Sequence, residues 1–186
     1  MEDRQKQIAA WVEQGFYQLV KDAEVENFEK IIQAAIDDKQ KDGTTEMFCD
    51  RLMLNLAYYE RNAAVWYTTF KMVLIGQLDF STAVIETELL TGQMQARQEV
   101  EEQREVLIPI FHEEYEKKAL TPEIIMYDYA YMSIAHALRV DFLTVCTMQE
   151  QRELLREGDA TETLRVIDGY VQYYADQFAR QLTLTI

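Results

Sequence analysis

Residues 121–158 read TPEIIMYDYAYMSIAHALRVDFLTVCTMQEQRELLREG, and this stretch decides the fold class. It opens with the clearest helix-start signal in the chain. Thr121 can cap a helix, Pro122 suits the first helical position, and Glu123 favours the positive end of the helix dipole. The closing glycine supplies a stop signal. Because the first half is apolar on nearly every side, we expect a long helix over 122–157 that is either central or half buried and half docking surface.

The same reasoning predicts helices along the rest of the chain. The last of them, 160–182, begins with the Asp159-x-x-Glu162 spacing of a capping box and carries an apolar seam of coiled-coil type. That seam consists of Leu164, Ile167, Val171, Tyr174 and Phe178. Apolar periodicity predicts further helices over 5–20, 22–41, 45–75, 82–106 and 110–118. Pro109 is expected to separate the last two.

These helices predict an all-α fold, a single-domain bundle over residues 1–186 with about five to seven helices. Two long helices, 45–75 and 122–157, are expected to be central. A hydrophobic content of 48% is ample for one core and excludes intrinsic disorder, whereas six glycines and two prolines are too few for a sandwich of short strands. Polar residues within 45–75 recur every seven positions and are expected to mark a face that meets water or a polar partner; they are Asn55, Asn62 and Thr69.

The charge balance restricts the class of partner. Lysine and arginine total 18 against 33 aspartates and glutamates, which gives a formal net charge of −15. Nucleic acids and anionic membranes are themselves negative, so we predict that the chain binds neither. The excess of acid is interpreted as a solvated surface, and an acidic DNA mimic that inhibits a DNA-binding protein is a further alternative.

The sequence carries no recognisable catalytic or metal-binding motif. Cys49 and Cys146 are far apart among apolar neighbours, so both are expected to be small buried hydrophobes rather than a disulfide. Glu-x-x-His pairs, glycine-rich phosphate loops and Gly-x-Ser-x-Gly are all missing. We therefore predict that the protein is not an enzyme and uses no cofactor or metal. A charged N-terminus and the lack of an apolar run of about 20 residues predict a cytoplasmic protein without a signal peptide.

A strip of polar residues crosses the apolar helix over 122–157. Ser133, His136 and Arg139 follow one another at a spacing of three, with Asp128 nearby, and Glu60 has a similar apolar setting on the helix over 45–75. One interpretation is a buried network that pairs Glu60 with Arg139 or His136 and fixes how the two helices pack. The other is a polar anchor for a small ligand inside an aromatic pocket.

Eight methionines and eleven tyrosines indicate a docking surface, because methionine is pliable and tyrosine buries area while keeping a polar tip. The candidate surface spans the helix over 122–157 and the last helix, and consists of Met126, Tyr127, Tyr129, Met132, Leu143, Tyr170, Tyr173 and Tyr174. We therefore predict a non-enzymatic cytoplasmic protein-interaction module, an adaptor, regulator or chaperone, whose partner is another protein or a second copy in a homodimer. A small-molecule-binding helical domain is the alternative.

Overall fold

The computed structural model describes residues 2–22, 30, 33, 34, 37, 45–119, 121–146 and 149–184. Within these residues the chain forms helices and no strand, which confirms the predicted all-α class. The helices are α1 (Glu2–Asp22), α3 (Thr45–Leu74), α4 (Thr82–Glu102), α5 (Arg104–Lys118), α6 (Pro122–Cys146), α7 (Gln149–Arg156) and α8 (Ala160–Leu184). The helix expected over 22–41 lies mostly outside the described residues, as does the side chain of Cys49, whereas Cys146 is a buried free thiol.

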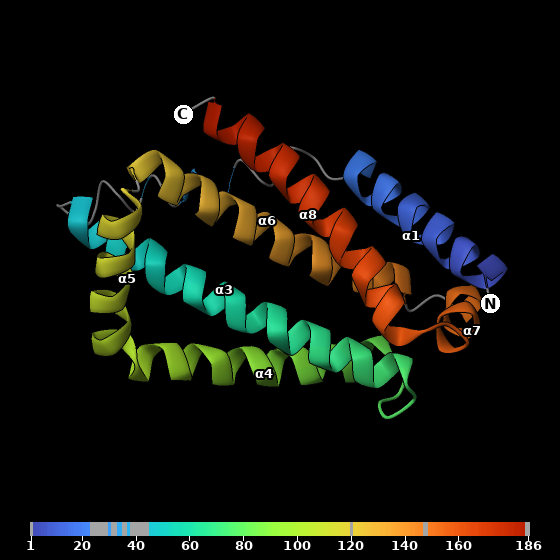
Figure 1. Cartoon of the computed structure of the whole chain (residues 1–186). Coiled ribbons are helices and arrows are strands. Elements are labelled where there is room, and N and C mark those ends of the chain that lie inside the picture. Colours follow the sequence, from blue (N-terminus) through green and yellow to red (C-terminus); the bar gives the residue numbers. More distant parts are fainter. Residues whose placement is uncertain are drawn as a thin grey trace.

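The helices α3 and α6 pack side by side (Figure 1). On its other side α3 carries α4, while α6 carries α8, and α1 lies against α8. The helix α5 runs across one end of α3 and α4, and α7 lies near the N-terminal end of α1. Both α3 and α6 therefore have neighbours on two sides, which explains why their apolar residues are not confined to one stripe.

The main hydrophobic core lies where α1, α3, α6 and α8 meet. Phe16 of α1 stacks on Phe142 of α6 with ring centroids 4.4 Å apart, and Trp66 stacks on Phe70 within α3 at 5.0 Å. Burying a side chain of this size stabilises the fold by about 1.5–3 kcal/mol. The expected seam of α8 also enters this core, through the buried residues Ile167, Val171 and Phe178.

The boundary between α4 and α5 differs from the expected one. Gln103 leaves the helical conformation with φ −97° and ψ 5°, so α4 ends at Glu102. The carbonyl of Gln103 then accepts hydrogen bonds from the backbone N–H groups of Val106 and Leu107, which begin the next helix at once. Pro109 therefore lies inside α5, where its missing N–H removes one backbone hydrogen bond without ending the helix.

The stretch expected as one helix over 122–157 contains two, α6 and α7, and residues 147 and 148 between them lie outside the described part. In the separate α7, which contacts α1 and α8, Leu155 is fully buried in the main core. The second helix thus buries an apolar side chain against the bundle.

The polar face expected on α3 is covered rather than solvated. Asn62 is 1% exposed and Thr69 is 7% exposed, while Asn55 is half-buried. The backbone of α4 comes close here, because a Cβ added at Gly92 would collide with the side chain of Val65, one turn from Asn62. Close packing of α4 on α3 therefore removes this face from water.

Candidate functional site

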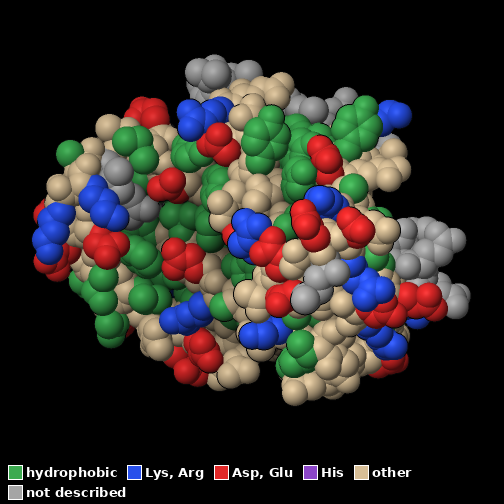
Figure 2. Space-filling model, turned by 45° about the vertical axis from the view of Figure 1, so that its right-hand side comes forward, with side chains coloured by type: hydrophobic (Ala, Val, Ile, Leu, Met, Phe, Trp, Pro, Cys, Tyr) green, Lys and Arg blue, Asp and Glu red, His purple; other side chains and the backbone are tan. Residues whose placement is uncertain are grey.

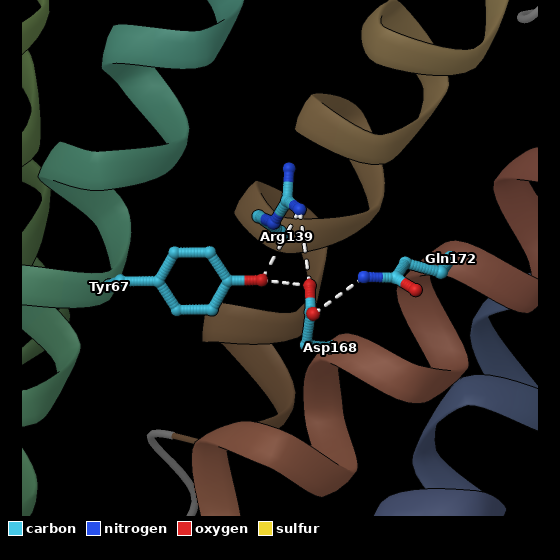
Figure 3. A network of polar contacts seen from close by, with 4 residues as sticks. All are labelled: Tyr67, Arg139, Asp168 and Gln172. Atoms are coloured by element: carbon cyan, nitrogen blue, oxygen red, sulfur yellow. Dashed lines mark hydrogen bonds and ion pairs between the residues drawn. The ribbon is translucent and has the colours of Figure 1, made fainter. Parts of the chain in front are cut away.

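A buried polar network joins α3, α6 and α8 (Figure 3). The side chain of Arg139 is 9% exposed, and its Nη2 donates to Asp168 Oδ1 and to the Tyr67 hydroxyl, each at 3.3 Å. The Tyr67 hydroxyl donates to the same Asp168 oxygen, and Gln172 Nε2 donates to the other at 2.7 Å. One buried cation is thus matched by one carboxylate that accepts from three side chains.

Neighbouring groups fix the position of Arg139. The indole Nε1 of Trp66 donates to the Arg139 carbonyl oxygen at 3.0 Å, which ties α3 to α6 beside the network. The guanidinium also lies over the ring of Tyr67, 5.2 Å from the centroid. These contacts fix how the three helices pack on one another. The Arg139 charge is paired with Asp168 inside the protein, which agrees with a buried network rather than a ligand anchor.

The other residues predicted for this network do not join it. Glu60 is exposed, and Asp128 is half-buried. His136 packs on the ring of Tyr59 with centroids 5.5 Å apart, and its pKa is lowered by burial and by the nearby Arg139 charge. The expected pairing of Glu60 with Arg139 or His136 is therefore wrong, because α8 brings its own carboxylate, Asp168, against Arg139.

The network predicts a decrease in stability at alkaline pH. Burial and the hydrogen bond to Asp168 raise the pKa of Tyr67 to about 12 from 10.0. The unfolded chain therefore loses this proton first, and the free energy of unfolding falls as pH rises from about 10 toward 12. We expect urea unfolding at stepped pH to show a shallower decline in Tyr67→Phe than in the parent. Equal declines in the two proteins would contradict the assignment of this loss of stability to the Tyr67 hydroxyl.

Most of the predicted surface on α6 is covered. Tyr129 is 8% exposed and Leu143 is 3% exposed, so neither is available to a partner. Met126 and Met132 are half-buried, and the hydroxyl of Tyr127 donates to Asp176 of α8. The physical reason is the position of α6 between α3 and α8, which cover two of its sides. The surface residues of α6 are thus corrected to core and edge-of-core positions.

The tyrosines of α8 lie beside an open groove. The groove has a volume of about 590 Å³ and is lined by Glu13, Arg165, Val166, Gly169, Tyr170, Tyr173 and Tyr174. Tyr173 is 58% exposed, and Tyr17 of α1, which sequence reasoning missed, is 62% exposed. A Cβ added at Gly169 would meet no atom within 4 Å, so the groove is open at this point. We call the seven lining residues the tyrosine groove.

The rings of the tyrosine groove are ordered by contacts beneath and beside them. Phe16 stacks on Tyr170 with centroids 5.9 Å apart and on Tyr174 at 6.4 Å. Tyr173 meets Tyr174 edge to face at 5.2 Å. Each ring has only two side-chain torsions, so little further conformational entropy is lost when a partner packs on them.

A second set of exposed apolar side chains lies on the other side of the bundle and was also missed from the sequence. Leu90 and Met94 of α4 are 58% and 66% exposed, and Val106 and Ile110 of α5 are 63% and 48% exposed. Each pair has the spacing of four that places both residues on one helix face. These aliphatic side chains are more flexible than the rings of the tyrosine groove.

No protein-family model matches the chain, and no curated protein or solved structure is significantly similar to it. In the part of the chain that the structure describes, no helix is both long and apolar enough to cross a membrane. The same residues contain no group of three or more His, Cys, Asp and Glu side chains arranged to hold a metal ion. The basis for a functional proposal is therefore the arrangement of the surface itself.

Proposed function

We propose that the chain is a non-enzymatic cytoplasmic protein-interaction module, an adaptor, regulator or chaperone, that receives a partner protein in the tyrosine groove. The observation that carries this proposal is the exposed ring of Tyr173, which lines a groove that is open at Gly169, with the exposed ring of Tyr17 on the neighbouring helix α1. Tyrosine is enriched at protein interfaces because its ring buries a large area and its hydroxyl remains able to hydrogen-bond.

The tyrosine groove is a better docking face than the outer faces of α4 and α5. Two of its rings, Tyr170 and Tyr174, stack on Phe16, and Tyr173 packs edge to face on Tyr174. Rigid aromatic anchors of this kind supply more binding free energy than flexible aliphatic side chains. Leu90 and Met94 share one face of α4, but their side chains are flexible, and the exposed residues around them on that helix are mostly polar.

The two alternative functions find less support. The Arg139 charge is engaged by Asp168 and Tyr67, so it is not free to anchor a small ligand. A DNA mimic needs rows of carboxylates spaced like phosphates, whereas the acidic groups on the face seen in Figure 2 are scattered among basic and apolar ones. Neither observation favours a second candidate.

The proposal predicts that a charge in the tyrosine groove abolishes complex formation. We expect native mass spectrometry of the parent, purified gently from its host, to show a stoichiometric complex that Tyr173→Lys does not form. The substitution removes the exposed ring and puts an ammonium group in its place, and the loss of an aromatic anchor costs about 2 kcal/mol or more, which weakens binding at least about thirtyfold. Circular dichroism of the free variant checks that it is folded.

Met94→Lys is the matched control. Met94 is at least as exposed as Tyr173 and receives the same charge, but it lies on α4 away from the groove. We expect this variant to keep the complex of the parent. A complex that survives Tyr173→Lys and is lost in Met94→Lys would place the docking face on α4 and overturn the proposal.

A further inference from the structure

The tyrosine groove carries one unneutralised charge. Glu13 is exposed at the groove, and among the described residues it forms no ion pair. Arg165, the other charged lining residue, is held by both carboxylate oxygens of Glu162, from Nε at 2.9 Å and from Nη2 at 2.5 Å. Burial and then the Glu13 charge raise the pKa of the Tyr170 hydroxyl, so the Glu13 carboxylate lies within electrostatic range of this tyrosine. The groove therefore presents a negative charge beside aromatic faces.

Aromatic faces of this kind attract cations, and guanidinium most of all. The face of a tyrosine ring is electron-rich, and the planar guanidinium both stacks on it and pairs with a carboxylate. The protein itself contains two guanidinium groups placed over tyrosine rings. Arg97 lies 4.7 Å from the ring centroid of Tyr58, and Arg139 lies 5.2 Å from that of Tyr67. An exposed set of tyrosines with a free carboxylate is complementary to the same group on another molecule.

We propose that the tyrosine groove binds an arginine side chain from a basic segment of the partner protein, with the guanidinium against the rings and beside Glu13. This inference rests on the proposed function and names the chemistry of its partner. A second copy of the chain is a poorer occupant, because each copy carries a net charge of −15 and the two would repel. A basic segment is instead attracted by the net negative charge of the protein, and the groove then binds one of its arginine side chains.

The test is an NMR titration of the full ¹⁵N-labelled chain with two peptides, acetyl-GRGRGRG-amide and the same peptide with citrulline in place of arginine. Citrulline keeps the shape of arginine but is neutral. We expect the arginine peptide to shift the amide resonance of Gly169, in the groove, while Gly76, at the end of α3, stays in place. The citrulline peptide is expected to bind at least about tenfold more weakly.

Two pairs of variants separate the groove from the general acidity of the protein. Glu13→Gln and Glu88→Gln change the net charge equally, but Glu88 is an exposed residue of α4. We expect Glu13→Gln to weaken binding of the arginine peptide about three- to tenfold and Glu88→Gln less than about twofold, because the effect of a distant charge is screened by salt. Tyr173→Leu, which keeps an apolar side chain without a ring, is expected to weaken binding about tenfold, and Met94→Leu to leave it unchanged.

Three results would overturn the proposed binding of arginine. Equal shifts of Gly169 by both peptides overturn the arginine assignment, although the groove then remains a docking face. Equal weakening by Glu13→Gln and Glu88→Gln, or no shift of Gly169 at about 1 mM arginine peptide, also overturns it. Failure of the proposed function has a different signature, which is a native complex that is unaffected by Tyr173→Lys.

Discussion

Replacing Asp168 with alanine is expected to lower the free energy of unfolding by about 3 kcal/mol, the low end of the range for breaking a buried ion pair. The low end applies because the Asp168 side chain keeps 30% exposure. The substitution leaves the Arg139 guanidinium, which is 9% exposed, without a counter-charge, and it removes the acceptor of Tyr67 and Gln172. Urea unfolding followed by circular dichroism at neutral pH measures the loss.

Asp176→Ala is the matched control on the same helix. Asp176 also pairs with an arginine and accepts from a tyrosine, but the side chain of Arg180 is 68% exposed and keeps its hydration when the pair is broken. We expect a clearly smaller loss than for Asp168→Ala. Adding Arg139→Met to Asp168→Ala removes the unpaired cation and is expected to restore part of the lost stability. Equal losses in the two aspartate variants would contradict the role of Asp168 as the counter-charge of the buried Arg139.

Replacing Asn62 with leucine is expected to raise the free energy of unfolding by about 1–3 kcal/mol. Asn62 is 1% exposed, and within the described part of the chain neither its Oδ1 nor its Nδ2 has a hydrogen-bond partner. A buried amide without partners loses its hydration and gains nothing in return, whereas leucine of similar size removes that cost and favours the helix. Thermal and urea unfolding of the variant measure the gain.

Asn55→Leu is the control for this substitution, because Asn55 precedes Asn62 by two turns of α3 and is only half-buried. We expect its effect to stay within about 0.5 kcal/mol, as is usual for sites near the surface. A loss of stability in Asn62→Leu would show that the amide makes hydrogen bonds in solution and would refute the unpaired state of this side chain.

Local signals predicted the helices well, because they depend only on neighbouring residues. Half of the capping box at the start of α8 is present, since the Glu162 N–H donates to Asp159 Oδ1 at 2.9 Å while the Glu162 carboxylate accepts from Arg165. Pro122 begins α6 as expected. The expectation for Pro109 differed from the structure, since a proline marks where a helix is weakened but does not determine where the chain turns. The helix is instead interrupted at Gln103, a residue type that is not a helix breaker.

The candidate sites were predicted only in part, because periodicity shows which face of a helix is apolar but not which helix covers it. Arg139 was identified from its apolar surroundings, yet its partner Asp168 was missed. The signal that could have indicated it is the polar pair Asp168 and Gln172, spaced by four beside the apolar seam of α8. Tyr17 was missed similarly, because the groove it borders forms only when α1 packs on α8.

The most direct test of the docking face is hydrogen–deuterium exchange by mass spectrometry on the free protein and on its native complex. Backbone amides that a partner covers or rigidifies exchange more slowly. If the partner occupies the tyrosine groove, protection appears in α1 around Glu13 and Tyr17 and in α8 around Gly169 and Tyr173. Protection confined to α4 and α5 around Met94 and Ile110, with α1 and α8 unchanged, would contradict this account.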